Sequence, residues 1–161
     1  MKTRIEEIIV EKCIAQHATV STAESCTGGL VAATLVNVAG VSDVFREGYI
    51  TYANGAKERI LGVSEGTLRQ HGAVSADTAY EMALGCARIA NSDYSIVTTG
   101  IAGPGGGTPE KPVGLVYLGC YAKGRVYTRE CHFKGTRMEI RQAAALCALE
   151  FLDENMYGGS Q

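Results

Sequence analysis

The most constraining feature of this sequence is the order in which helical and strand-like apolar patterns follow one another. Five short runs rich in β-branched and apolar residues predict strands, at 19–22, 44–52, 94–99, 113–121 and 125–133. Helical spacing of apolar residues predicts helices at 3–17, 30–36, 55–61, 64–70, 76–90 and 136–154. Lys123 and Gly124, between the last two strands, are typical of a tight hairpin, which makes the sheet mixed. This order predicts an α/β fold, a three-layer α/β/α sandwich around a sheet of about five strands.

Short polar residues mark where several of these helices begin. Ser64 and Ser75 each precede a helical pattern and can act as N-caps. Thr136 and Glu139 have the spacing of a capping box at the start of the last helix. The helix at 30–36 is apolar on nearly every side, so we expect it to be buried between the sheet and another layer. The last helix is expected to turn inward the residues Ala143, Ala144, Cys147 and Phe151.

Length and composition fit one globular domain. The chain has 161 residues, of which 46% are hydrophobic, and its sequence contains neither an internal repeat nor a linker. We therefore expect a single domain over residues 1–161, with residues 158–161 as a frayed tail. The six cysteines are dispersed and lack a CxxC pair, which favours reduced core thiols over a disulfide framework.

Charge and hydropathy narrow the possible partners. Fifteen Lys and Arg against 17 Asp and Glu give a formal charge of −2, so no basic field is available to hold a nucleic acid. The first residues lack a secretory signal, and no window reaches the roughly 20 apolar residues of a membrane helix. We expect a cytoplasmic protein with no nucleic-acid or membrane partner, and apolar helices in a small α/β domain favour a homo-oligomer. No cluster of side chains has metal-ligand spacing, so no metal is expected.

The corner between the first strand and the second helix is the first candidate for chemistry. Ser25 follows the strand, and Gly28 and Gly29 precede the helix, so the hydroxyl can be exposed near free backbone N–H groups that could stabilise an oxyanion. The alternative is that Ser25 or Thr27 only caps the helix and that the glycines only permit close packing. Cys26 is a further alternative, because a helix N-terminus favours a thiolate.

Lys57 offers a base for Ser25. Asn54 is a plausible N-cap for the helix 55–61, which places Lys57 in a first helical turn, where the macrodipole disfavours a bound proton. A Ser-Lys pair is therefore conceivable, and none of the three histidines is a favoured member of a Ser-His-Asp triad. The alternative interpretation of Lys57 is a solvated surface charge.

Two segments could bind an anion. The glycine- and proline-rich loop at 100–112 follows a strand, and its segment Gly103 to Gly107 could hold a phosphate through N–H groups, although it lacks a Walker ending. Arg137 and Arg141 lie one turn apart at the start of the last helix and together could bind one phosphate group. The alternative is a solvated basic face.

Several segments resemble one known family, and in the same order. Residues 22–29, Thr-Ala-Glu-Ser-Cys-Thr-Gly-Gly, are similar to the signature of the CinA C-terminal domain family, the nicotinamide-nucleotide amidases. The other matching segments are Tyr52 to Lys57, Gly62 to Val63, Gly72 to Ser75, Thr99 to Pro104, Lys111 to Gly114 and Phe133 to Arg141. The resemblance therefore covers nearly the whole chain. Some members carry an additional N-terminal domain, and the resemblance implies a stand-alone amidase here.

The resemblance implies hydrolysis of the carboxamide of nicotinamide mononucleotide to nicotinic acid mononucleotide and ammonia, without a cofactor. Ser25 would be the nucleophile and Lys57 the base that shuttles protons. The remaining expected site residues hold the oxyanion or the substrate, and they are Cys26, Thr27, Gly28, Gly29, Tyr52, Asn54, Ala102, Gly103, Pro104, Arg137 and Arg141. Among these, Arg141 and the Gly103 loop would hold the phosphate.

Two positions depart from the family's pattern. Gly55 stands where the family usually has Glu, and Thr136 where an Asp often precedes the Arg. The rival function is a non-catalytic nucleotide-binding or regulatory module linked to competence or DNA damage, which would bind without turnover.

Overall fold

A five-stranded mixed sheet forms the centre of the molecule. The computed structural model describes residues 2–156, so the tail expected at 158–161 lies outside the described residues. The strands are β1 (Val20–Glu24), β2 (Phe45–Ile50), β3 (Tyr94–Gly100), β4 (Leu115–Ala122) and β5 (Arg125–His132). They lie in the order β2-β1-β3-β4-β5. β1 is parallel to β2 and β3, whereas β4 is antiparallel to β3 and β5, so the expected hairpin and the mixed sheet are confirmed.

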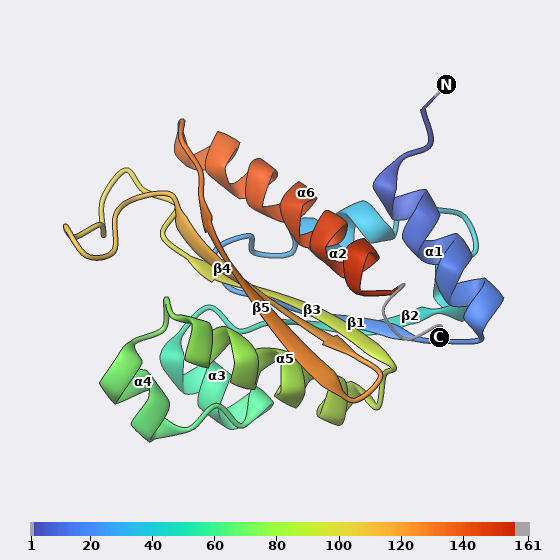
Figure 1. The fold of residues 1–161 in the computed structure, drawn as a ribbon, viewed down its shortest axis with the longest axis horizontal. Helices are drawn as coiled ribbons and strands as arrows, with labels where there is room; N and C mark the ends of the chain where they lie inside the picture. The colour runs from blue at the N-terminus through green and yellow to red at the C-terminus, as the bar shows by residue number, and fades with distance from the viewer. Residues whose placement is uncertain (1, 157–161) are drawn as a thin grey trace.

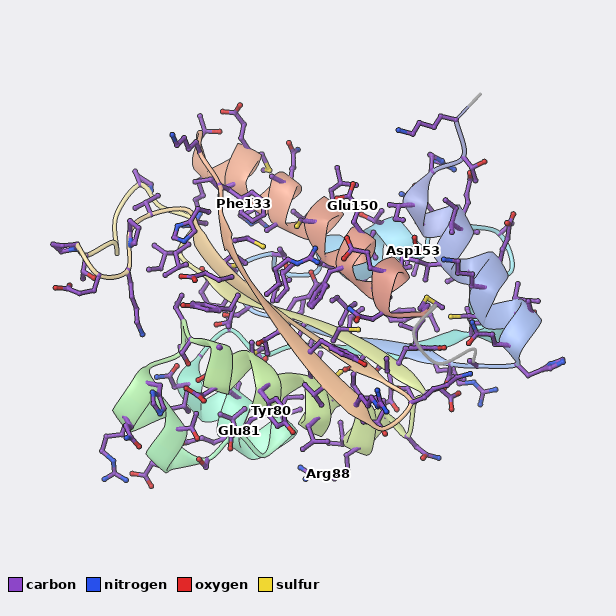
Figure 2. The ribbon with its side chains drawn as sticks, viewed as in Figure 1. Tyr80, Glu81, Arg88, Phe133, Glu150 and Asp153 are labelled. Carbon is purple, nitrogen blue, oxygen red and sulfur yellow. The ribbon has the colours of Figure 1, made fainter. Side chains whose placement is uncertain are left out.

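Helices cover both faces of this sheet (Figure 1). One face carries α1 (Ile5–Gln16), α2 (Leu30–Leu35) and α6 (Arg137–Met156), and the other carries α3 (Asn54–Leu61), α4 (Glu65–His71) and α5 (Ala76–Ala90). A short 3-10 helix, Val41–Asp43, leads into β2. The three-layer α/β/α sandwich predicted from the sequence is confirmed. Within the layer of α1, α2 and α6, Asp153, labelled on α6 in Figure 2, forms a partly buried ion pair with Lys12 of α1.

The register of the three parallel strands gathers their carboxyl ends at one edge. Glu24, the last residue of β1, lies opposite Ile50 of β2 and Thr98 of β3. Every residue of β1 is buried, as is typical of a parallel strand covered on both faces. The loops that leave these three ends therefore meet, which is where ligands bind in open α/β sheets.

The helix starts mostly follow the predicted caps. Ser64 and Ser75 accept hydrogen bonds from Thr67 N and Thr78 N. Thr136 and Glu139 form the expected capping box, in which Thr136 N donates to Glu139 Oε1 at 3.0 Å and Glu139 N donates to Thr136 Oγ1 at 3.2 Å. The prediction that Asn54 caps a helix is wrong. α3 begins one residue earlier, and its cap is Ala53, whose carbonyl accepts from Ala56 N and Lys57 N.

Two predictions of burial need correction. α2 is not buried all round, because it lies in an outer layer with Val31 and Leu35 turned inward and Val36 52% exposed. On α6, Ala144 and Phe151 are buried as expected. Ala143 and Cys147 are only half-buried, because they lie at the edges of the inward stripe, which is formed by Ile140, Ala144, Ala145, Ala148, Leu149 and Leu152.

The cysteines follow the prediction of reduced core thiols. All six are free, five are buried and Cys147 is half-buried. Within residues 2–156, no helix combines the length and the apolar character that a membrane crossing needs.

Candidate active site

The corner after β1 is held by backbone hydrogen bonds. Ser25 N donates to Thr98 O of β3 at 3.0 Å, and Gly28 N donates to Ser25 O at 3.0 Å. Gly28 and Gly29 have φ values of 59° and 110°, a left-handed conformation that residues with a side chain rarely adopt. The glycine pair is therefore needed for the turn itself, and it fixes Ser25 at the tip of the strand.

Glu24 stabilises this corner by accepting hydrogen bonds from the residues that follow it, a role that the sequence did not predict. The carboxylate is 1% exposed and accepts from Thr27 Oγ1 at 2.6 Å, Val31 N at 2.8 Å and Ala32 N at 3.1 Å. It thus caps α2 with a negative charge at the positive end of the helix. The signal in the sequence is an acidic residue at the end of an apolar strand, just before a helix whose own first residues offer no cap.

Lys57 lies under Ser25. Its side chain is 1% exposed, and Lys57 Nζ is 3.3 Å from Ser25 Oγ. The same nitrogen donates to Thr51 O at 3.0 Å and to Tyr52 O at 3.2 Å. Ser25 itself is 8% exposed, and both residues line the same pocket. The structure therefore brings the two expected catalytic side chains together and buries the base.

The surroundings of Lys57 favour its neutral form. Burial lowers the pKa of the amine below its ordinary value, because a buried site disfavours the charged form. Cys26 would oppose this shift only as a thiolate, but burial raises the pKa of Cys26 to about 11, so this thiol is neutral at neutral pH. A neutral amine can donate to the carbonyls of Thr51 and Tyr52 and still present its lone pair to the Ser25 hydroxyl. That arrangement suits a general base.

A pocket of about 280 Å³ opens above Ser25 and Lys57. It is lined by Ser25, Cys26, Tyr52, Lys57, Ala73, Val74, Thr99, Gly100, Ile101, Ala102, Gly103, Gly105, Gly106 and Arg137. Ala73 and Val74 come from the turn between α4 and α5, and sequence reasoning did not assign them to the site. The only signal for them was the family-like segment that contains them. Their apolar side chains give the pocket a wall suited to a flat, apolar ring.

The two arginines at the start of α6 have different partners. Arg137 lines the pocket and donates to Gly103 O at 2.7 Å and to the Tyr52 hydroxyl at 3.0 Å. Arg141 donates from Nε to Cys26 O at 3.0 Å and from a terminal nitrogen to Thr27 O at 3.0 Å. The structure thus places Arg137 at the pocket and Arg141 behind the nucleophile corner, and it does not bring both guanidinium groups to one anion.

The other expected residues are distributed around the pocket. Ala102 and Gly103 line it, and Pro104 follows Gly103 across a cis peptide bond. Asn54 is exposed at the start of α3 and is not part of the pocket lining. Thr27 is buried beneath the corner, where its hydroxyl contacts Thr98 Oγ1 at 2.8 Å. In the described range 2–156, no group of three or more His, Cys, Asp or Glu side chains could hold a metal ion.

Comparison with known proteins identifies the family. The sequence model of the CinA C-terminal domain family matches residues 2–156, so the chain belongs to this family. A protein of Clostridium beijerinckii described as competence-damage inducible is 53% identical over 92% of this chain, and a CinA-like protein of Kosmotoga olearia is 55% identical over 92%. The match covers 36% of each of these relatives, so the chain spans about a third of their length.

Solved structures agree. The competence/damage inducible protein CihA from Agrobacterium tumefaciens is 44% identical, with a TM-score of 0.85 over 94% of this chain and 97% of that one. A CinA superfamily protein from Escherichia coli is 35% identical, with a TM-score of 0.90 over 93% of this chain and 88% of that one. The arrangement of the sheet and the helices is therefore that of the family.

Proposed function

We propose that this domain is an amidase that hydrolyses the carboxamide of nicotinamide mononucleotide to nicotinic acid mononucleotide and ammonia. The observation that carries the proposal is the contact of 3.3 Å between Lys57 Nζ and Ser25 Oγ at the base of a pocket. A buried amine with a lowered pKa beside a serine hydroxyl is an arrangement used for acyl transfer.

In the proposed reaction, Ser25 Oγ attacks the amide carbon while Lys57 accepts the hydroxyl proton. Lys57 then returns this proton to the amide nitrogen, the C–N bond breaks and ammonia leaves an ester on Ser25. Water attacks this ester with Lys57 as its base, which releases the carboxylate and restores the hydroxyl.

Backbone N–H groups at the corner would stabilise the oxyanion. Gly28 N donates to the Ser25 carbonyl, and Val31 N and Ala32 N donate to Glu24. Leu30 N donates to the Thr27 carbonyl, so these engagements leave the N–H groups of Cys26, Thr27 and Gly29 as candidate oxyanion donors, and we favour Cys26 and Thr27, the two that follow Ser25 directly. Arg141 supports the assignment of the Thr27 N–H, because the Cys26 carbonyl to which it donates lies in the same peptide plane as that N–H group.

The substrate's other groups fit the rest of the pocket. We place the pyridine ring against Ala73 and Val74, and the phosphate near Arg137 and the Gly103 loop, because Arg137 brings a guanidinium group to the pocket. A guanidinium group binds phosphate oxygens through charge-assisted hydrogen bonds. Displacing the contact between Arg137 and the Gly103 carbonyl would free that donor for the phosphate.

The test is ammonia release from nicotinamide mononucleotide by the purified domain. Ser25→Ala should lower kcat by on the order of 10⁴-fold or more, because the nucleophile is lost. Ser64→Ala, on the surface at the start of α4, is the matched control and should keep full activity. Affinity for the nucleotide without turnover in the wild type would favour the non-catalytic module instead.

A further inference from the structure

Two cysteines outside the pocket lie against each other. Cys131 of β5 and Cys147 of α6 have their sulfur atoms 3.9 Å apart, within hydrogen-bond reach for thiols. Cys131 is buried and Cys147 is half-buried. In Figure 2, Phe133 is labelled where the chain leaves β5 for α6. Neither thiol lines the pocket.

The surroundings make the two thiols unequal. The hydrogen bond from Cys131 lowers the pKa of Cys147 to about 7, and the charge of Arg129 acts in the same direction, against burial and the carboxylates Glu150 and Glu154. The pKa of Cys131 is raised, first by that same hydrogen bond and then by its burial. Arg129 is held in place by Glu154, at 2.6 Å, and by the Phe151 ring. Cys147 is thus the better nucleophile, and Cys131 is the neighbouring thiol that can resolve an oxidised Cys147.

We propose that Cys131 and Cys147 are an oxidisable pair, which a hydroperoxide converts into a disulfide between β5 and α6. The Cys147 thiolate attacks one peroxide oxygen, and the O–O bond breaks to give a sulfenic acid on Cys147 and hydroxide, which becomes water by taking up the proton that the Cys147 thiol lost on ionisation. The Cys131 sulfur then attacks the sulfenic sulfur, the S–O bond breaks, and a second water leaves with the thiol proton. Two thiols are oxidised and one peroxide is reduced.

The remaining four cysteines do not offer the same chemistry. Cys13, Cys26, Cys86 and Cys120 are buried, and burial raises the pKa of each thiol. The disulfide would close the segment 131–147, which carries both Arg137 and Arg141. The pair itself stands independently of the amidase proposal.

Peptide mapping of the wild-type domain tests this inference. The reduced protein is treated with hydrogen peroxide at neutral pH, the remaining thiols are alkylated, and the chain is digested without reductant. We expect one linked peptide joining Cys131 to Cys147, with the other four cysteines alkylated. Wild-type protein that keeps both thiols while a reference dithiol is fully oxidised, or that links other cysteines instead, would overturn the proposal.

Variants assign the order of the two steps. In Cys131→Ser, Cys147 should stop at the sulfenic acid and become labelled by dimedone, whereas in Cys147→Ser the Cys131 thiol should stay reduced. Cys120→Ala, in the core of the sheet, is the control and should still form the link. Dimedone labelling of Cys131 at an equal rate in Cys147→Ser would contradict the assigned order. Circular dichroism confirms that each variant is folded, and the wild-type mapping decides the proposal without them.

Discussion

The two sides of the pocket are built in different ways. On the nucleophile side, Ser25 and Lys57 are buried and are surrounded by backbone carbonyls at 3.0 to 3.5 Å. On the opposite side, Arg137 is held by the carbonyl of Gly103 and by the hydroxyl of Tyr52, a residue that is 59% exposed. The first side is fixed by the fold, whereas the second is formed by an exposed loop and long side chains.

This difference separates chemistry from binding. A nucleophile and a base that are held by buried contacts are already in position before the substrate arrives, so changes there should act on kcat. Contacts made by exposed side chains can exchange one partner for another, so changes there should act on KM. The predictions below test whether the two effects can be separated.

After loss of the nucleophile, removal of the base should have the largest effect. In Lys57→Met the side chain keeps its approximate length and burial but cannot accept a proton, so kcat should fall by about 10³-fold with little change in KM. Steady-state kinetics with nicotinamide mononucleotide measures both constants. Lys2 is exposed at the start of the described residues, so Lys2→Met is the matched control and should keep the wild-type kcat and KM. A Lys57 variant that keeps more than half the activity would show that this side of the pocket is not the catalytic one.

The pH profile should report the same amine. The pKa of Lys57 is lowered by burial, and the protonated form, which cannot act as a base, accumulates as the pH falls through that pKa. Below it kcat/KM should fall about tenfold per pH unit, with an inflection below the pKa of a free lysine. The same profile measured with nicotinamide riboside as the substrate separates the two titrations, because the riboside has no phosphate group to titrate. An inflection at the pKa of an ordinary lysine would contradict the proposed neutral base.

The two arginines of α6 sharpen the comparison. Arg137→Gln should raise KM by about 10- to 100-fold with kcat nearly unchanged, because one charge-assisted contact to the phosphate is lost. Arg141→Gln should instead lower kcat, because the Cys26–Thr27 peptide plane, which carries the proposed Thr27 N–H donor, and the Thr27–Gly28 plane lose their support. Arg69→Gln, exposed on α4, is the control for a lost positive charge. If Arg141→Gln raises KM as Arg137→Gln does, the two sides are not separate.

The fold could be read from the sequence because its signals are local and agree with one another. The strand patterns, the hairpin at Lys123 and Gly124, and the capping box of Thr136 and Glu139 all depend on residues close in the chain. The start of α3 could not be read in this way. Asn54 has the better capping side chain, but the Ala53 carbonyl accepts the first hydrogen bonds of the helix, and backbone path rather than side-chain type decides the boundary.

The site was only partly readable for a similar reason. Ser25 and its glycines are adjacent in sequence, so their corner is a local feature. Arg137 and Arg141 are one helical turn apart and look equivalent in sequence. Which of them reaches the pocket depends on how α6 crosses the corner after β1, and that depends on packing of the whole layer. Glu24 was missed because its three donors become close only when α2 packs back over the strand.

The smallest predicted effect comes from stiffening α3, the helix that carries Lys57, and it tests whether motion of this helix contributes to catalysis. Gly55 is exposed on α3, and a Cβ there would meet nothing within 4 Å, so Gly55→Ala should raise the free energy of unfolding by about 0.5 kcal/mol through helix propensity. Thermal unfolding should show a Tm increase of about 1–2 °C. Gly66→Ala on α4, equally exposed and equally open, is the matched control and should give the same shift. If buried contacts alone fix Lys57, both variants keep the wild-type kcat, whereas a change in kcat confined to Gly55→Ala would mean that motion of α3 takes part in the reaction.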